Sequence, residues 1–324
     1  MHSEMGPQEV FGPQTDWLGA EKCSDASVVA IGNFDGVHLG HAALVRSAKT
    51  KAVQLGIPCF VLTFDPHPSA VLGKGATTPL ATLRERCDRL IEAGADHVLV
   101  QKFDTAFAGL TPLAFVEDVL MQRLGAKACH VGSNFRFGQN AAGNVDTLRS
   151  LGMDRGFSVE CASLVSDGAA SFSSSRVRVA LAEGDTDDAA IVLGRPYAFS
   201  GTVVRGEQRG RTIGFPTANL GEILTVVPKR GVYAVRASKG PTTAHGTSPL
   251  LGVMNIGVRP TVSGEGRESV EVHLFDFEGD LYGHELRVEI AARLRDEAKF
   301  PSFAALKAQI ETDALNARRL LANA

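Results

Sequence analysis

The stretch VVAIGNFDGVHLGH, residues 28–41, determines the fold that we expect for the first half of the chain. Its apolar start predicts a buried strand, Gly32 and Gly36 mark a tight turn, and a helix is expected to open at the histidines. The N-terminus of a helix that follows a strand in this way is a ready anion site, because its unpaired N–H groups and its dipole both favour phosphate. The i, i+3 spacing of His38 and His41 predicts that both imidazoles lie on one helix face and reach one polyphosphate.

The length and composition of the chain limit its class. Its 324 residues are enough for two ordinary domains, and 44% hydrophobic with 21% charged residues is typical of a soluble globular protein. The formal net charge of −3 argues against an extended nucleic-acid grip, which needs many basic side chains. No apolar run approaches the roughly 20 residues of a membrane span, and residues 1–8 lack the features of a secretory signal.

The cysteine pattern indicates a reducing compartment. The cysteines are widely scattered and form no C-x-x-C pair, which is typical of reduced thiols rather than of a disulfide framework or a zinc site. We expect each to be a small buried hydrophobe, and the protein to be cytoplasmic. The residues concerned are Cys23, Cys59, Cys87, Cys129 and Cys161.

The first half of the chain alternates apolar strands with amphipathic helices. This alternation predicts a parallel sheet covered on both faces, that is, a Rossmann-like α/β domain. Residues 1–20 are irregular in composition and are expected to form no regular element. The predicted strands are 28–31, 58–63, 97–101 and 127–131, and the predicted helices are 41–55, 83–93 and 112–124.

The pattern changes after Ser173. Gly194 is the expected domain boundary, so that the two domains span 1–193 and 194–324. Beyond it, short apolar runs separated by turn residues predict an antiparallel barrel or sandwich. The predicted helices are 174–183, 186–193 and a final one over 303–321, and the predicted strands are 199–205, 231–237, 250–256, 269–275 and 285–292.

The histidines and the turn before them predict a nucleotide site. Alone, H-x-G-H is a short pattern, but its strand–turn–helix context favours nucleotide binding over buried or surface histidines. Adenylyl transfer needs no protein nucleophile; it needs phosphate oxygens held in line and the charge of the leaving pyrophosphate neutralised. Asp35 is either a turn residue and helix-cap acceptor or a direct metal contact. The candidate ATP-binding residues are Gly32, Asn33, Phe34, Asp35, Gly36, His38 and His41.

A second cluster of hydroxyl and guanidinium groups lies at residues 173–178, SSSRVR. In one interpretation its serines cap a helix and its arginines are solvated. In the other, Ser174, Ser175 and Arg176 hold a triphosphate from the side opposite the histidines. The upstream H-x-G-H favours the second interpretation.

Two segments that follow predicted strands are candidates for contact with the acceptor of the transferred group. Residues 64–68 (FDPHP) end a strand with prolines, at the place where parallel sheets commonly have their site. Residues 131–138 (VGSNFRFG) carry Phe135 and Phe137, which either stack a flat ring or belong to the core. The candidate residues are Phe64, Pro66, Pro68, Asn134 and Phe137.

The second half holds a glycine-rich loop next to two polar side chains. Residues 205–214 carry three arginines and are either a solvated hairpin or a flap that meets a nucleotide. Thr217 and Asn219 alternate, so both side chains face the same way on an extended segment, and their oxygens are hard ligands suited to Mg²⁺. The candidate ATP-binding residues here are Gly206, Arg211, Gly214, Pro216, Thr217 and Asn219.

Glu271 is the candidate general base of the second half. It lies on an alternating strand with Val270 and Val272 on the other face, and a merely polar strand face is the alternative. Phosphoryl transfer to a hydroxyl requires a carboxylate that takes a proton from the alcohol, close to magnesium-bound ATP.

These motifs, in this order and over nearly the whole chain, resemble the bacterial bifunctional riboflavin kinase/FMN adenylyltransferase (FAD synthetase) family. The resemblance implies a first domain of the HIGH-type nucleotidylyltransferases, in which His38 and His41 bind and stabilise the phosphates while AMP moves from ATP to FMN. It implies that residues 174–176 match the second ATP clamp. Asn134 matches a position near the flavin phosphate and the reacting centre, where many relatives carry Asp.

For the second domain the resemblance implies an antiparallel β-barrel riboflavin kinase with a terminal helix. Residues 216–219 (PTAN) match the kinase signature of the family, residues 257–261 (GVRPT) match a further loop, and Glu271 matches the catalytic base. The implied flavin-binding residues are Arg259, Thr261, Lys299 and Phe300.

The expected function is the ATP-dependent phosphorylation of riboflavin to FMN in the second domain and adenylyl transfer to FMN, giving FAD and pyrophosphate, in the first. The expected small molecules are riboflavin, FMN and ATP, with Mg²⁺; neither nucleic acid nor a membrane is an expected partner, and a homo-oligomer is left open. Two alternatives stay open. One is a nucleotide- or flavin-binding protein with a single active half, and the other is a tRNA-binding protein with H-x-G-H.

Overall fold

The computed structural model describes residues 15–19, 21–73, 75, 77–162, 165–168, 170–206, 215–240, 248–259 and 267–322, with the main chain alone for Arg259 and Arg267. The chain divides into two compact units, Met1–Ser173 and Ser174–Ala324. The boundary that the sequence suggests, at Gly194, lies after the two helices with which the second unit begins.

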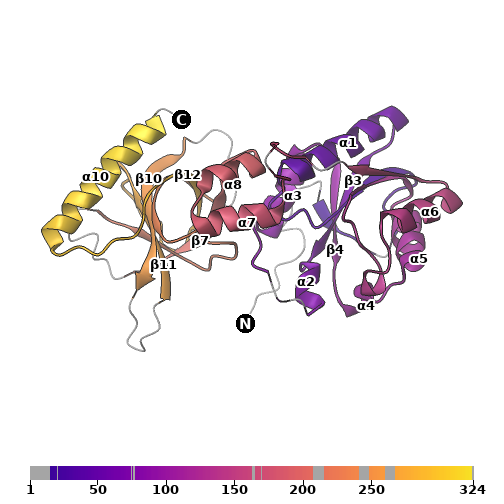
Figure 1. Ribbon diagram of the computed structural model, residues 1–324, viewed down its shortest axis with the longest axis horizontal. Coiled ribbons are helices and arrows are strands. Elements are labelled where there is room, and N and C mark those ends of the chain that lie inside the picture. Colours follow the sequence, from indigo (N-terminus) through magenta and orange to yellow (C-terminus); the bar gives the residue numbers. More distant parts are fainter. Residues whose placement is uncertain are drawn as a thin grey trace. The chain divides into compact units, whose positions relative to one another are not determined.

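The first unit is built on a six-stranded sheet in the order β1-β4-β3-β2-β5-β6 (Figure 1). Every pairing in it is parallel. Its inner strands are mostly apolar and buried, as expected where helices cover both faces of a sheet. The strands are β1 (Thr15–Trp17), β2 (Ser27–Ile31), β3 (Cys59–Asp65), β4 (His97–Lys102), β5 (Ala126–Gly132) and β6 (Ser158–Ala162). The predicted Rossmann-like α/β fold is confirmed.

Two hydrophobic clusters lie on opposite faces of this sheet. On one face Val28 and Ala30 of β2 pack with the buried side of α1 (Leu39–Leu55). On the other face Val29 and Ile31 pack with the helix η2 (Phe115–Arg123). The remaining helices are α2 (Pro68–Val71), α3 (Leu83–Glu92), α4 (Thr105–Ala108), α5 (Pro112–Ala114), η3 (Gln139–Ala141) and α6 (Val145–Arg155).

The structure contains elements of this unit that the sequence did not predict. β1 forms within the segment expected to be irregular, and its three residues are too few to show alternation. The half-exposed edge strand β6, the helix α6 and the short helices α2, α4 and η3 were not predicted. Residues 115–123 form a π-helix rather than an α-helix, and the apolar spacing of the sequence cannot distinguish the two.

The second unit contains a closed antiparallel barrel with the strand order β10-β11-β8-β7-β12-β9 (Figure 1). The barrel, not the sandwich, is therefore the correct alternative. β8 was not predicted, because its four residues are too few to show an alternating pattern. The strands are β7 (Ala198–Val204), β8 (Ala218–Gly221), β9 (Gly231–Lys239), β10 (Leu250–Arg259), β11 (Arg267–Leu274) and β12 (Glu285–Arg295).

Three helices of the second unit lie within the described part of the chain. α7 (Ser174–Glu183) and α8 (Thr186–Leu193) precede the barrel, and α10 (Phe303–Ala322) closes the unit as predicted. α10 packs on the outside of the barrel, where its Ala317 contacts the cluster formed around Ala234 and Phe275. The buried Asp313 of α10 accepts two hydrogen bonds from Arg295 Nε, of 3.1 and 3.0 Å, at the end of β12.

The cysteines follow the prediction only in part. Cys59, Cys87 and Cys129 are buried, and burial raises the pKa of the Cys59 and Cys87 thiols to about 12. Cys161 is half-buried. The expectation is wrong for Cys23, which is exposed because it lies in the loop before β2.

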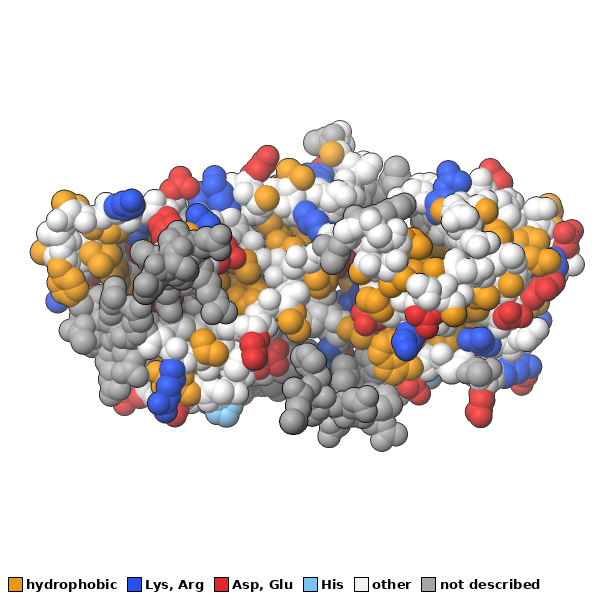
Figure 2. All heavy atoms as spheres, turned by 90° about the horizontal axis from the view of Figure 1, so that it is seen from below, with side chains coloured by type: hydrophobic (Ala, Val, Ile, Leu, Met, Phe, Trp, Pro, Cys, Tyr) orange, Lys and Arg blue, Asp and Glu red, His pale blue; other side chains and the backbone are white. Residues whose placement is uncertain are grey.

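The surface carries both signs of charge. On the face seen in Figure 2, acidic and basic side chains are interspersed, in line with a formal net charge of −3. Within the described part of the chain, none of the helices combines the length and the apolar character that crossing a membrane requires.

Candidate functional site

The turn between β2 and α1 has an unusual main chain. Phe34, Gly36 and Val37 have φ angles of 52°, 76° and 42°. Only the glycine adopts this region without strain, so the surrounding structure must hold the other two in place. The Phe34 ring is fully buried and contacts Gly32, where an added Cβ would lie 3.2 Å from the ring. The turn is therefore a buried, pre-formed loop of main chain.

The two histidines lie at the start of α1 in different roles. His38 is the N-cap residue, just outside the helix, and its Nδ1 accepts the N–H of His41 at 3.3 Å. The predicted helix, 41–55, thus begins two residues too late, and only His41 lies within the observed helix. The first free N–H groups of a helix need an acceptor, and the His38 side chain supplies one. The two rings stack with centroids 3.6 Å apart and planes 20° apart.

Gly40 explains why a glycine separates the two histidines. An added Cβ at this position would lie 3.0 Å from the His38 ring. The imidazole therefore occupies the space that a larger residue would need. The four residues of H-x-G-H form one packing unit.

The electrostatics of the site favour a neutral His41. Burial, and secondarily the neighbouring His38, lowers the pKa of His41 well below 6.5. Its Nδ1 is buried and finds no hydrogen-bond partner within the described residues. Because Nδ1 of His38 accepts the His41 N–H, that nitrogen carries no proton, and the proton of the His38 ring lies on Nε2.

His38, rather than Asp35, is the N-cap residue of α1. The buried Asp35 carboxylate accepts the N–H of Leu80 at 2.8 Å, which ties the turn to the segment before α3. Asn33, next to the turn, brings its Nδ2 to within 3.2 Å of His67 Nε2. His67 is the N-cap of α2; it lies in the candidate segment 64–68 but was not itself among the candidate residues. Its place between prolines, directly after a strand, is a signal that could have identified it.

The candidate flavin contacts of the first unit fall into two groups. Phe64 and Phe137 are buried, each 7% exposed, and belong to one hydrophobic cluster. Phe137 thus packs in the core, one of the two alternatives given for it, and so does Phe64. Pro66 and Asn134 are exposed, and Pro68 occupies the first turn of α2. The exposed residues follow the carboxyl ends of β3 and β5, where parallel sheets place their ligands.

Ser174 and Ser175 are the first residues of α7. In the same helix Arg176 is already engaged, since its Nε donates to Asp188 Oδ2 at 3.0 Å and its Nη2 donates to the other carboxylate oxygen. To bind this guanidinium, a phosphate must either share it with the Asp188 carboxylate or displace that carboxylate. Arg178 donates to the carbonyl of Ser174 at 3.3 Å.

The barrel brings its predicted residues together by strand register. Asn219 of β8 lies directly opposite Glu271 of β11. Thr217, just before β8, donates its hydroxyl to Glu271 Oε2 at 3.3 Å. Gly206 packs against the Asn219 amide, and an added Cβ there would lie 2.3 Å from Nδ2. One hydroxyl, one amide carbonyl and one carboxylate thus meet, and this all-oxygen donor set fits Mg²⁺.

Two neighbours extend this arrangement. His273 Nδ1 lies 2.8 Å from the Pro216 carbonyl, a hydrogen bond that holds the segment before β8 against β11. Asn255 of β10 is the other register partner of Glu271 and is not among the predicted residues. An asparagine in the apolar run LLGVMNIGV is the signal that could have identified it.

The remaining predicted residues of the second half are less informative. Arg211, Gly214 and Thr261 lie outside the described residues, and Arg259 is described by its main chain alone. Lys299 is exposed, and Phe300 lies half-buried with the Arg295 guanidinium 5.6 Å from its ring centroid.

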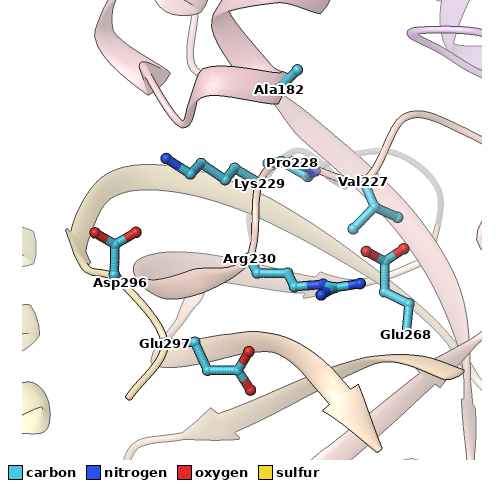
Figure 3. A pocket seen from close by; sticks show the side chains of 8 residues that line it. All are labelled: Ala182, Val227, Pro228, Lys229, Arg230, Glu268, Asp296 and Glu297. Carbon is cyan, nitrogen blue, oxygen red and sulfur yellow. The ribbon is translucent and has the colours of Figure 1, made fainter. Parts of the chain in front are cut away.

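The second unit also has a pocket of about 640 Å³ (Figure 3). It contains both signs of charge, and Arg230 points across it toward Glu268. Of the predicted site residues that the structure describes, none lines it. The lining residues are Ala182, Val227, Pro228, Lys229, Arg230, Glu268, Asp296 and Glu297.

Comparisons with known proteins assign each half to a family. A model of FAD synthetase matches residues 20–176, and a model of riboflavin kinase matches residues 193–321. The chain is 42% identical over 295 residues to the bifunctional riboflavin kinase/FMN adenylyltransferase of Escherichia coli K12, covering 91% of this chain and 92% of that protein. The Bacillus subtilis (strain 168) protein of the same name is 36% identical over 302 residues, covering 92% and 93%.

One solved structure resembles the chain along most of its length. It is a crystal structure described as a macrolide-efflux protein from Streptococcus pneumoniae, with 30% identity and a TM-score of 0.82, covering 93% of this chain and 95% of that one. The identity to the curated relatives over nine-tenths of the chain, together with the two family models, determines the family. The chain belongs to the bifunctional riboflavin kinase/FMN adenylyltransferase family.

Proposed function

We propose that this chain catalyses both reactions for which its relatives are named. It phosphorylates riboflavin to FMN, and it transfers AMP from ATP to FMN, giving FAD and pyrophosphate. Adenylyl transfer is assigned to residues 1–193 and the kinase to residues 194–324. The observation that carries the proposal is the match of two different family models to the two halves, each of which contains one of the two sites described above.

In the adenylyl half, the turn after β2 and the start of α1 receive the ATP phosphates. His38 donates from Nε2, and His41 is a neutral neighbour because burial lowers its pKa. Donors aimed at oxygens on which charge develops stabilise the transition state as pyrophosphate leaves. The FMN phosphate attacks the α-phosphorus, and Asn134, exposed after β5, contributes a hydrogen bond near that centre.

Phosphate binding is also proposed for residues 174–176, which match the second ATP clamp of the family. Ser174 and Ser175 offer hydroxyls at the N-terminus of α7, a favourable position for an anion. Arg176 joins them when the phosphate competes with Asp188 for its guanidinium. Removing the carboxylate with Asp188→Asn is therefore expected to strengthen ATP binding rather than to weaken it.

In the kinase half, Glu271 accepts the proton of the riboflavin primary hydroxyl while the γ-phosphoryl group of ATP is transferred. The Thr217 hydroxyl, which donates to this carboxylate, orients it. Thr217 and Asn219 are the residues that would hold Mg²⁺, which when bound supplies positive charge to the phosphates. A chelator in excess of the added Mg²⁺ is expected to stop FMN formation.

The test separates the two half-reactions. The purified chain with riboflavin, ATP and Mg²⁺ should form FMN and then FAD, measured by chromatography. Glu271→Gln should lower FMN formation by about 100-fold or more, since a positioned base contributes that much, and should leave FAD formation from supplied FMN unchanged. His38→Ala should do the reverse.

Matched controls keep the result interpretable. Glu278→Gln changes an exposed carboxylate in the turn after β11, and His97→Ala changes an exposed imidazole in the first unit. Both should retain both activities. If Glu271→Gln and His38→Ala removed the same half-reaction, the assignment of the halves would be wrong. If the wild-type chain formed neither flavin product, the proposal would fail altogether.

The location of the protein remains an expectation. The scattered cysteines, with no C-x-x-C pair, favour a reducing compartment. We therefore propose a cytoplasmic enzyme.

A further inference from the structure

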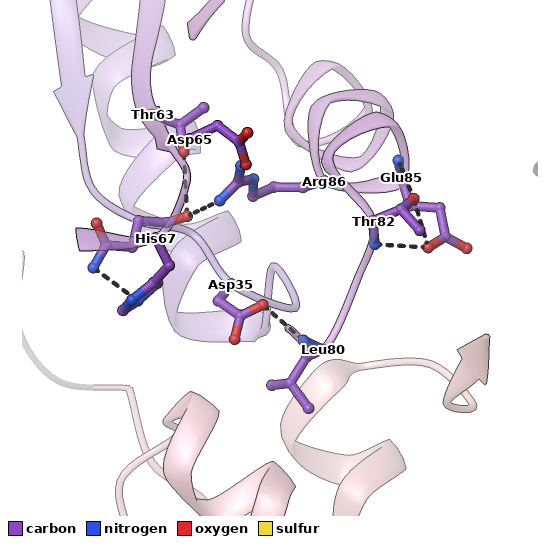
Figure 4. A network of polar contacts seen from close by, with 9 residues as sticks. Asp35, Thr63, Asp65, His67, Leu80, Thr82, Glu85 and Arg86 are labelled. Atoms are coloured by element: carbon purple, nitrogen blue, oxygen red, sulfur yellow. Dashed lines mark hydrogen bonds and ion pairs between the residues drawn. The ribbon is translucent and has the colours of Figure 1, made fainter. Parts of the chain in front are cut away.

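Arg86 occupies an unusual position for a charged residue. It belongs to α3, whose start is fixed by a capping box: the Thr82 hydroxyl accepts the Glu85 N–H at 3.2 Å, and Glu85 Oε2 accepts the Thr82 N–H at 3.1 Å. Arg86 follows directly and is only 6% exposed. Its side chain extends from α3 toward the carboxyl ends of β2 and β3 (Figure 4).

The guanidinium of Arg86 joins two segments of the sheet edge. Its Nη1 donates to the main-chain carbonyl of Asn33 at 3.1 Å, and its Nη2 lies 3.4 Å from Asp65 Oδ1 at the end of β3 (Figure 4). The buried Thr63 hydroxyl donates to the same carbonyl at 3.2 Å. The Asn33 carbonyl therefore has two side-chain donors.

Burying this cation is costly. Its only ion-pair partner in the described part of the chain is Asp65, whose side chain is 40% exposed. Burial raises the pKa of Asp65, and Arg86 offsets only part of that rise. The Arg86 Nε is buried without a hydrogen-bond partner among the described residues. Since an apolar side chain could fill this space at lower cost, the guanidinium serves a geometric purpose.

The position of Asn33 indicates that purpose. It stands between β2 and the turn with positive φ angles that leads to His38. Its side-chain amide contacts His67, so its main chain and side chain are both held. A carbonyl fixed by two donors sets the direction in which the strained turn leaves the sheet.

We propose that Arg86 is a positioning residue for FMN adenylyl transfer, which acts by fixing the Asn33 carbonyl and so orienting the turn that carries the two stacked histidines. This inference rests on the proposed adenylyl activity of the first half. Arg86 itself need not touch a substrate.

The first experiment replaces the guanidinium by an apolar side chain of similar length. Arg86→Met should lower kcat for FAD formation from FMN and ATP by about tenfold to 100-fold, the range expected for a misplacement of about 1 Å, with a much smaller change in the KM for ATP. Riboflavin phosphorylation by the same sample should stay within about twofold of the wild type, because the kinase half does not depend on α3. Arg86→Lys keeps one donor and should recover part of the lost kcat.

Arg89→Gln is the matched control, since Arg89 lies in the same helix and pairs with Glu92 near the surface. It should leave kcat unchanged. A normal kcat in Arg86→Met, with only a lower melting temperature, would overturn the proposal. Should Arg86→Met fail to fold, Arg86→Lys decides: a reduced kcat at the wild-type melting temperature supports the proposal, and an unchanged kcat overturns it.

A second experiment tests whether Arg86 acts through Asn33. Thr63→Val removes the other donor to the same carbonyl. The double variant Thr63→Val/Arg86→Met should lose more kcat than the product of the two single losses, because the buried carbonyl then lacks both donors. Losses that simply multiply would overturn the proposed route. If the wild-type chain formed no FAD from FMN, the proposed function itself would have failed, and this outcome is distinct from normal activity in Arg86→Met.

Discussion

The two proposed sites of this chain are built in different ways. The proposed adenylyl site is a turn of main chain with positive φ angles at Phe34, Gly36 and Val37, and N–H groups and imidazoles are its proposed donors. The proposed kinase site is a set of side chains, from Thr217 to Glu271, that extended strands bring together by register. The first depends on what holds a loop in place, and the second depends on which side chain stands at each strand position.

This difference has consequences for mutation. A turn that is strained needs outside support, which here comes from Leu80 through Asp35 and from Arg86 through Asn33. Strands that pair over many residues need little such support. Substitutions far from the histidines should therefore affect adenylyl transfer, whereas the kinase should respond mainly to changes within its own contacts.

Among the tests of this comparison, the largest effect is expected at Gly206. A Cβ there would lie 2.3 Å from the Asn219 amide, which is itself buried. Gly206→Ala should therefore displace a predicted metal ligand and lower riboflavin phosphorylation by about 100-fold. FAD formation from supplied FMN should not change. Chromatography of both reactions on one sample checks this, and equal losses in both would contradict a local effect.

Gly40 gives the matching substitution in the adenylyl half, with a smaller effect. An added Cβ would lie 3.0 Å from the His38 ring, which can shift by a few tenths of an ångström. Gly40→Ala should lower FAD formation by about tenfold and spare the kinase. Gly19→Ala is the control, because a Cβ there has its nearest neighbour at 3.9 Å. A larger loss at Gly40 than at Gly206 would reverse the comparison drawn here.

The same difference between the two sites determines what could be predicted from the sequence. The apolar strands and the turn before His38 are local signals, so the α/β fold and the nucleotide turn follow from residues 28–41. The N-cap role of His38 could not be predicted, because the apolar spacing does not fix the residue at which a helix begins. The strands β1 and β8 are too short for any periodicity.

Contacts between residues far apart in the sequence could not be predicted either. The sequence suggests Thr217, Asn219 and Glu271 separately, but the register that places Asn219 opposite Glu271 is set by closure of the barrel. In the same way, the charged helix that carries Arg86 gives no sign that one of its arginines is buried against Asn33. Amphipathic patterns predict which face of a helix is buried, and they do not predict which charge is buried on it.

The pH dependence of stability should reflect the first unit. The folded pKa of His41 lies well below 6.5, because burial and then His38 disfavour its charged form. Above pH 6.5 neither state holds this proton, and below it the unfolded chain binds the proton first, so stability is lost as the pH falls. The slope from one such group is at most about 1.4 kcal/mol per pH unit. His41→Leu should flatten it, measured by urea unfolding followed through Trp17, the single tryptophan.

His130 should also make stability fall as the pH falls, so part of the pH dependence of stability should remain in His41→Leu. Burial lowers its pKa, although the nearby Glu160 offsets part of the change. His130→Leu should remove a further share. A slope in the wild type that is unchanged in both variants would show that neither buried imidazole controls acid stability.

The smallest effect is expected at the capping box of α3. Thr82→Ala removes the acceptor of the Glu85 N–H and should cost about 1 kcal/mol of unfolding free energy. Thr111→Ala removes the corresponding cap of α5, where the Thr111 hydroxyl accepts the Ala114 N–H at 3.1 Å, and should cost a similar amount. Only α3 carries Arg86, so only Thr82→Ala should also lower kcat for FAD formation, by about twofold to threefold, with KM unchanged. Equal kcat values in the two variants, at matched losses of stability measured by urea unfolding, would mean that the turn holds its direction without α3. The proposed adenylyl site would then depend no more on contacts from outside its own residues than the barrel strands do.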